Sequence, residues 1–303
     1  MKNSGFAAFI ITYERTEILL NTIAIITNQT FPPAYLLIVD NSFSDNTQNA
    51  LKQYISNSFE YHRVGYNSGP AGGAKIGLEN LANLGYDWIY WGDDNNPPRD
   101  KNVFQEMFKG IHQLSKRGKP GIFGGKGGSF NPWTGRVKSL SNKELRAKKY
   151  AGADFIPGGQ TLITNAEVVR QGIVPEEKLF FAFEDLDFCL KVKAAGYKIY
   201  VDSNSWLRVR LRDNYKKDAY RWKGSSFGGN TSFPREYYST RSLLDIFFKR
   251  QYYTAFAIVF FKSLAKIALG FRFGWNYGKS MARVQTSALK DFFFGKFGKQ
   301  VDL

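Results

Sequence analysis

The sequence predicts an α/β protein in which a mostly parallel sheet precedes a basic helical region. Short apolar runs alternate with segments of helical periodicity through the first two hundred residues, which is typical of repeated β-α-β units. The formal charge of +16 is concentrated at the end of the chain, because residues 205–303 contain 19 Lys/Arg and only 6 Asp/Glu. We therefore expect an α/β domain at residues 1–204 and a basic, aromatic helical region at residues 205–303.

The first hundred residues contain four apolar runs of strand length, each followed by polar or glycine-rich residues. Pro32-Pro33 separates the first helix from the second strand, and residues 67–73 predict a glycine-rich loop before a helix. Such a loop lets the backbone approach a ligand and leads into a helix N-terminus, which favours anions. The strands are expected at 6–13, 35–39, 61–64 and 87–91, and the helices at 15–27, 46–56 and up to about 83.

The second hundred residues give a weaker strand pattern. Residues 118–135 are rich in Gly and Pro and residues 136–150 are basic and polar, so we expect both to form loops. Beyond them the pattern of strands and helices returns. Strands are expected at 156–163 and 197–201, and helices from Asn165 to about Gly172 and from Glu184 to Ala195.

An acidic motif follows the fourth predicted strand. Asp93 and Asp94 are adjacent, Asn95 follows them, and Pro97 forces the chain to turn. Neighbouring carboxylates repel each other, so a site that keeps both usually supplies a cation. Because ligands bind at the carboxyl ends of strands in open α/β sheets, the motif predicts a divalent metal holding a phosphate-bearing substrate.

Other polar residues at strand ends are expected to converge on the same edge of the sheet. Asp40 is suited to accept hydrogen bonds from a base or a ribose, and Arg15 is suited to neutralise a phosphate. Tight turns between strands would explain any one of these features alone. Their occurrence in order along the chain favours a nucleotide site.

The ordered set resembles the inverting family 2 glycosyltransferases with a GT-A fold, over residues 6 to about 205. The matching segments are Thr12-Tyr13-Glu14-Arg15, the Asp40–Thr47 stretch, the glycine-rich residues 67–73, Asp93-Asp94-Asn95 and Glu184-Asp185. Within that family, the alanine-glycine-glycine sequence and the aromatic strand before the acids are similar to galactofuranosyltransferases and rhamnosyltransferases of bacterial polysaccharide assembly.

The resemblance implies roles for individual residues. Asp185 would be the general base that deprotonates the acceptor hydroxyl, and Glu184 would orient that base or bind the acceptor. Ordinary acidic capping of a helix is the alternative for this pair, but the aromatic run before it favours the catalytic role. The remaining assignments are the nucleotide and donor contacts Thr12, Tyr13, Arg15, Asp40, Asn67, Gly72, Gly73 and Asp93, the metal ligands Asp93, Asp94 and Asn95 for Mn²⁺ or Mg²⁺, and the acceptor contacts Gly158, Gly159, Gln160 and Trp206.

The sequence departs from the family pattern at the metal. Asn95 replaces a third acid, and no histidine follows the last predicted strand, where many relatives have one. We therefore expect the metal to be only weakly required, and Arg208 or Arg210 to share the neutralisation of the diphosphate. The alternative is that both arginines simply belong to the basic tail. His62 and His112 are expected to be structural.

The C-terminal region combines apolar stripes with lysines and arginines. Its longest charge-free run, residues 251–261, is shorter than the roughly 20 residues of a spanning helix, so we expect interfacial helices on an anionic membrane surface. A helical subdomain packed on the catalytic domain is the alternative. Nucleic acid is disfavoured as a partner because no nucleic-acid motif accompanies the charge. The single cysteine, Cys189, excludes an internal disulfide and is expected to be buried.

These observations lead to one functional expectation. The chain would transfer a sugar with inversion, from UDP-galactofuranose or next from dTDP-rhamnose, to a lipid-linked or glycan acceptor in cell-surface polysaccharide synthesis. The apolar run near the N-terminus is too short for a signal peptide, so we expect a peripheral protein on the cytoplasmic face of the membrane. The alternative is a degenerate relative that binds nucleotide sugar or glycan without catalysis.

Overall fold

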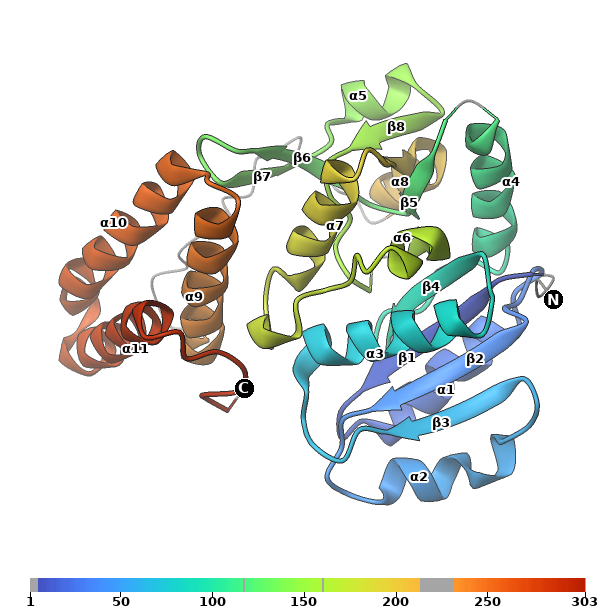
Figure 1. Ribbon diagram of the computed structural model, residues 1–303, viewed down its shortest axis with the longest axis horizontal. Coiled ribbons are helices and arrows are strands. Elements are labelled where there is room, and N and C mark those ends of the chain that lie inside the picture. The colour runs from blue at the N-terminus through green and yellow to red at the C-terminus, as the bar shows by residue number, and fades with distance from the viewer. Residues whose placement is uncertain (1–4, 117, 160, 213–231, 303) are drawn as a thin grey trace.

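An eight-stranded mixed sheet forms the centre of the protein (Figure 1). The computed structural model describes residues 5–116, 118–159, 161–212 and 232–302. The strand order is β3-β2-β1-β4-β9-β5-β10-β8, and only β9 and β8 run antiparallel to their neighbours. The strands are β1 (Ala7–Thr12), β2 (Tyr35–Asp40), β3 (Phe59–Arg63), β4 (Trp88–Asp93), β5 (Pro120–Gly124), β8 (Tyr150–Ala153), β9 (Leu162–Asn165) and β10 (Lys198–Asp202). The predicted mostly parallel sheet is therefore confirmed.

Helices cover both faces of the sheet. Alternate residues of β1 point to opposite sides, so that Phe9 joins one buried cluster and Ile10 the other. Leu19 of α1 and Phe104 of α4 pack with Ile10, whereas Leu78 of α3 packs on the side of Phe9. The helices of this domain are α1 (Thr16–Thr27), α2 (Asn46–Leu51), α3 (Gly69–Asn83), α4 (Val103–Ser115), α5 (Asn142–Ala147), α6 (Ala166–Arg170), α7 (Glu184–Ala194) and α8 (Ser203–Arg212), with 3-10 turns η1 (Lys52–Tyr54) and η2 (Glu177–Leu179).

The glycine-rich stretch is not a loop, which corrects the expectation for residues 67–73. Helix α3 already begins at Gly69, so Gly72 and Gly73 lie in its first turns. A Cβ at Gly73 would come within 2.9 Å of the Ile11 side chain, and one at Gly77 would overlap the Phe9 ring. Gly73 and Gly77 therefore allow α3 to pack closely on β1, while nucleotide contacts by Gly72 and Gly73 remain predictions.

Residues 118–150 form regular structure, contrary to the expectation of loops. β5 lies inside the sheet although it begins at Pro120 and ends at Gly124. Its glycines leave room for large neighbouring residues, since a Cβ at Gly121 would lie 2.7 Å from Tyr197. Residues 128–139 form a separate hairpin of β6 (Gly128–Asn131) and β7 (Arg136–Ser139). The strand expected at 156–163 begins only at Leu162, and residues 156–159 form a loop.

Three helices form the C-terminal region and pack against one another beside the α/β domain: α9 (Phe233–Lys249), α10 (Tyr253–Leu269) and α11 (Trp275–Phe293) (Figure 1). The β6-β7 hairpin reaches them, since the Phe130 ring lies 5.9 Å from Phe247 and 5.7 Å from Tyr252. The expected helical region is therefore present, and it is packed on the α/β domain.

Helix α10 is longer and more apolar than the sequence analysis indicated. Together with η3 (Gly270–Phe273) it forms a 21-residue stretch, Tyr253–Phe273, which contains an 18-residue window with a mean hydropathy of 1.6. Within the described part of the chain, this is one helix that could cross a membrane by length and composition alone. Only 22% of this window is buried inside the protein.

Candidate active site

Asp94 connects the turn that contains Asp93, Asp94 and Asn95, the acidic turn, to β1 and α1. Its carboxylate accepts a hydrogen bond from the Thr12 hydroxyl at 2.9 Å and contacts Arg15 Nη1 at 3.4 Å. Its backbone is fixed as well, because the Asp94 N–H donates to Ile11 O at 3.2 Å and the Thr22 hydroxyl donates to Asp94 O at 2.5 Å. The predicted donor contacts Thr12 and Arg15 are thus brought together with Asp94, a predicted metal ligand.

The surroundings of Asp93 disfavour the ionised form of its carboxyl group. Burial raises its pKa, and the negative charges of Asp94 and Asp185 raise it further, to about 6, although Arg15 opposes the shift. The influence of Asp185 means that the acids of β4 and α7 face a common region. A divalent cation at Asp93 would relieve this repulsion.

The residues at this turn fit a cation that shares its coordination with a substrate. Among the described residues, no group of three or more His, Cys, Asp or Glu is arranged to hold a metal. Each oxygen of Asp94 has one protein partner and a further lone pair, so Asp93, Asp94 and Asn95 can all offer oxygens to a cation. Mg²⁺ and similar ions accept one or two protein oxygens when phosphates and water complete the shell. A metal-ligand role for Asp94 remains a prediction.

Asp185 is held by two backbone N–H groups at the start of α7. Leu186 N–H donates to its Oδ1 at 2.7 Å, and Gly158 N–H donates to its Oδ2 at 3.0 Å. Gly159 has a φ of +67°, and a Cβ there would overlap the Asp93 carboxyl group. The loop that contains Gly158 and Gly159 therefore lies between the two acids. Gln160, the third predicted acceptor contact, lies outside the described residues.

A turn of unusual backbone precedes Asp185. Phe180, Ala182 and Phe183 have φ values of 63°, 68° and 67°, in the left-handed region that residues other than glycine rarely adopt. Each such residue costs about 1–3 kcal/mol and persists only where the surrounding structure imposes it, often at a functional site. The sequence analysis missed this turn. Its only signal in the sequence was an aromatic run placed directly before two acids.

The predicted nucleotide side is an interlinked set of loops after β1, β2 and β3. Asp40 is fully buried and accepts hydrogen bonds from Ser42 N–H at 2.8 Å and Tyr61 OH at 2.8 Å. The Tyr13 ring is 41% exposed and lies edge-on to Phe43 at 6.2 Å. Tyr13 is therefore available to a ligand, while the observed partners of Asp40 belong to the protein.

Three further side chains hold these loops together. Asn41 accepts a hydrogen bond from the Ser68 hydroxyl at 2.7 Å and donates to Gly69 O at 3.2 Å. Asn67, a predicted nucleotide contact, accepts from Gly69 N–H at 3.0 Å and so starts helix α3. Glu14, which the sequence analysis gave no role, accepts from the Phe43 N–H at 2.7 Å.

Arg208, Arg210 and Trp206 pack α8 onto its neighbours. Arg208 pairs with Glu106 of α4 at 2.6 Å, and Arg210 donates to Asn142 at 2.7 Å. Trp206 is buried, with the Arg210 guanidinium 4.0 Å from its ring. The arginine that contacts the acidic motif is instead Arg15. Diphosphate contacts by Arg208 or Arg210, and an acceptor contact by Trp206, remain predictions.

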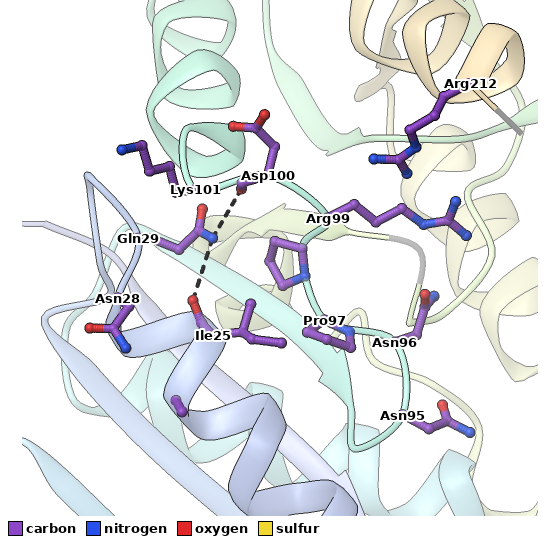
Figure 2. Close-up of a pocket in the computed structure, with 12 residues that line it drawn as sticks. Ile25, Asn28, Gln29, Asn95, Asn96, Pro97, Arg99, Asp100, Lys101 and Arg212 are labelled. Carbon is purple, nitrogen blue, oxygen red and sulfur yellow. Dashed lines mark hydrogen bonds between the residues drawn. The ribbon is translucent and has the colours of Figure 1, made fainter.

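A cavity of about 740 Å³ adjoins the acidic turn (Figure 2). Asn95 and Asn96 line one side of it, and the side chains of Arg99 and Arg212 extend above them in this view. The C-terminal end of α1 forms the opposite wall. The lining combines apolar groups with the cations Arg99, Lys101 and Arg212 and the acid Asp100.

Comparison with known proteins identifies the family. The sequence profile of glycosyl transferase family 2 matches residues 7–163, more than half of the chain. The chain therefore belongs to glycosyltransferase family 2. A curated relative, galactofuranosyltransferase GlfT1 from Mycolicibacterium smegmatis, is 28% identical over 109 residues. The match covers 36% of this chain and 35% of GlfT1, so the chain spans about a third of that relative.

Solved structures establish the GT-A fold. The chain superposes on mannosyltransferase PcManGT from Pyrobaculum calidifontis, in complex with GDP-Man and Mn²⁺, with a TM-score of 0.54 at 11% identity, over 96% of this chain and 87% of that chain. The S. aureus TarS 1–349 structure with UDP-GlcNAc gives a TM-score of 0.52 at 12% identity and covers both chains fully. GalNAc-T7 with UDP, GalNAc and Mn²⁺ gives a TM-score of 0.54 at 15% identity, over 70% of this chain and 49% of that chain. The predicted fold class is confirmed.

Proposed function

We propose that this glycosyltransferase transfers a sugar with inversion from a nucleoside diphosphate donor to a lipid-linked or glycan acceptor, in cell-surface polysaccharide synthesis. The observation that carries the proposal is the placement of Asp185. Its carboxylate is oriented by two backbone N–H groups and is close enough to Asp93 to raise the pKa of that acid. A carboxylate so placed is suited to act as a base next to a diphosphate site.

The proposed mechanism is a single displacement. Asp185 accepts the proton of the acceptor hydroxyl as that oxygen attacks the anomeric carbon, on the face opposite the departing diphosphate. Asp93, Asp94 and Asn95 would hold a divalent cation, Mn²⁺ or Mg²⁺, which would neutralise the diphosphate when bound. Arg15 adds a positive charge beside Asp94. Attack from the opposite face inverts the configuration at the sugar.

UDP-galactofuranose is the favoured donor and dTDP-rhamnose the next. Support comes from the partial match to a protein named as a galactofuranosyltransferase. The two solved relatives with named nucleotide sugars carry GDP-Man and UDP-GlcNAc, so the fold accommodates more than one base and sugar. The exposed Tyr13 ring is the group that we expect to stack on the base.

We further propose that the C-terminal helices bind the cytoplasmic face of an anionic membrane. On α10, Lys266 pairs with Glu236 of α9, and Ser263 donates to Gln285 of α11 at 2.8 Å, so one face of the helix is occupied by protein. This arrangement favours a helix that lies along the bilayer over one that crosses it. Exposed apolar side chains on the other surfaces are Phe248, Ile258, Phe261, Leu264, Leu269, Trp275, Phe293 and Phe294.

A catalytically degenerate sugar-nucleotide or glycan binding protein is the second candidate. The absence of a third acid at Asn95 favours it. A transfer assay decides between the two: the purified protein, with Mn²⁺ or Mg²⁺ and a membrane lipid extract, is offered a panel of nucleotide sugars. Turnover of one donor with product of inverted configuration supports the enzyme. Binding of a nucleotide sugar without hydrolysis or transfer of any donor would establish the binding protein.

A further inference from the structure

A buried arginine connects the C-terminal region to the turn that precedes Asp185. Arg241 of α9 has no exposed surface. Its Nη2 donates to Leu179 O at 3.2 Å and to Gly298 O at 2.9 Å, and its Nη1 donates to Tyr237 OH at 3.1 Å and to Lys296 O at 3.3 Å. A buried guanidinium is costly unless it is hydrogen-bonded, so these carbonyl groups define where it sits.

The same helix covers the left-handed turn. The Tyr238 ring lies 5.1 Å from the Phe180 ring and 6.0 Å from the Phe181 ring, and the Ser242 hydroxyl donates to Phe181 O at 3.2 Å. Tyr238 and Phe180 belong to one buried cluster that is separate from the two clusters of the sheet. Helix α9 therefore contacts the turn through both side chains and backbone, at Phe180, which has a positive φ, and at the adjacent Phe181.

The C-terminal segment, residues 296–302, completes this arrangement. Tyr238 OH donates to Val301 O at 2.6 Å and accepts from the N–H groups of Gln300 and Val301, each at 3.1 Å. Gly298 N–H donates to Lys178 O at 2.7 Å, next to Leu179. Figure 1 shows this end of the chain between α9 and the start of α3. The segment is thus held between α9 and the residues that lead into the turn.

We propose that Arg241 is a positioning residue for Asp185. By holding Leu179 O together with the C-terminal segment, it keeps the turn at residues 180–183 in its left-handed conformation. The conformation of residues 180–183 sets where α7 begins, and therefore where the Asp185 carboxylate accepts the hydrogen bond from Gly158. This inference rests on the proposed function for its catalytic consequence, but the clamp itself is a structural claim that can be measured without turnover.

The alternative is that α9 supports only the stability of the helical region. Gln285 offers a matched control, because it is fully buried and bonds Thr240 at 3.0 Å and Ser263 at 2.8 Å, both within the three C-terminal helices. Gln285→Leu therefore removes buried hydrogen bonds from this region and leaves the contacts of Arg241 with Leu179 in place.

The test compares Arg241→Gln, Ser242→Ala and Gln285→Leu in the full chain. For each we would measure the melting temperature, amide exchange in residues 180–186, UDP binding, and kcat with the active donor. We expect Arg241→Gln to lower kcat by at least about tenfold, since small displacements of a catalytic group have effects of this size. Its affinity for UDP should stay within about twofold of the wild type. Exchange in residues 180–186 should accelerate in Arg241→Gln and, to a smaller extent, in Ser242→Ala. Gln285→Leu should lower the melting temperature without changing either exchange in that segment or kcat.

Unchanged exchange in residues 180–186 of folded Arg241→Gln would overturn the clamp, whatever the activity. Accelerated exchange with unchanged kcat would overturn the positioning role. An equal loss of kcat in Gln285→Leu at matched stability would also overturn it. If Arg241→Gln does not fold, Ser242→Ala decides, because it removes only the hydroxyl that bonds Phe181 O. Failure of the wild type to transfer any sugar would instead count against the proposed function, and the exchange measurement would still test the clamp.

Discussion

The backbone N–H of Gly158 donates a hydrogen bond to Asp185 Oδ2 over 3.0 Å. This bond joins the loop before β9 to the first turn of α7, two segments 27 residues apart in the chain. A carboxylate that accepts a backbone N–H has a fixed orientation. The geometry of the proposed base is therefore determined by a glycine that contributes no side chain.

Asp185→Asn should abolish transfer and leave donor binding intact. The amide keeps the shape of the side chain but cannot accept a proton, so we expect kcat to fall by at least about 10³-fold. UDP affinity, measured by calorimetry, should change by less than about twofold. Near-normal turnover of the variant would remove Asp185 from the role of base.

Gly159→Ala should damage the site through Asp93. A Cβ at this position would overlap the Asp93 carboxyl group, and the backbone at φ +67° disfavours alanine. We expect at least about a tenfold loss of kcat/KM, with a lower affinity for Mn²⁺. Gly152→Ala is the matched control, since a Cβ there meets nothing within 4 Å. Equal activity of the two variants would contradict the placement of the loop against Asp93.

Asn95→Asp should strengthen the response to a divalent cation. A carboxylate binds Mn²⁺ or Mg²⁺ more strongly than an amide oxygen, so the metal concentration for half-maximal activity should fall by several-fold, about 1 kcal/mol. The measurement is a titration of metal back into protein treated with EDTA. If EDTA leaves the wild type fully active, cationic side chains suffice to neutralise the diphosphate, and the metal proposal is wrong.

The contact between η2 and α9 should make stability depend on pH. Burial by itself raises the pKa of Glu176, but Lys191 and Lys249, with Nζ atoms 3.7 Å and 3.3 Å away, lower it below its usual 4.5. A carboxyl group whose pKa is depressed by folding contributes stability above its unfolded pKa and loses that contribution as the pH falls. The free energy of unfolding of the wild type should exceed that of Glu176→Gln by about 0.2–1 kcal/mol at pH 7. In thermal melts, the difference should shrink as the pH falls below 4.5.

The exposed rings of α10 and α11 should determine membrane binding. Phe261 and Phe293 are 65% and 63% exposed, and both contact Phe260. Replacing both with serine should weaken binding to vesicles of anionic phospholipid by at least about tenfold, because two large apolar side chains no longer enter the lipid. Ile55→Ser, at a 58% exposed position on the α/β domain, is the control. Equal binding of all three proteins in a sedimentation assay would exclude this surface.

The sequence predicted the fold best where local patterns and tertiary structure agree. The apolar runs that end at Thr12, Asp40 and Asp93 became strands β1, β2 and β4, because alternating burial on two faces requires such runs. The same reasoning failed for β5 and for the start of α3. In both, a glycine leaves room for a large residue that is distant in the sequence, such as Tyr197 beside Gly121. No local sequence pattern indicates that neighbour.

The sequence indicated the acids of the candidate site better than the residues that orient them. Asp93, Asp94 and Asp185 stand out in the sequence as carboxylates at the ends of apolar runs. Their partners do not, because Gly158 acts through its backbone and Arg241 lies 56 positions after Asp185. Fixed orientation depends on contacts between distant segments, which a single sequence does not show.

The packing of Gly69 against the turn affects how substitutions in this protein are to be interpreted. A Cβ at Gly69 would overlap Phe180 O, and Ala71 N–H donates to the same oxygen at 3.3 Å. The first turn of the helix beside the nucleotide loops thus rests on the segment that leads to the base. A change at Gly69 would alter donor affinity and proton transfer together, so neither kinetic constant alone could assign it to one substrate.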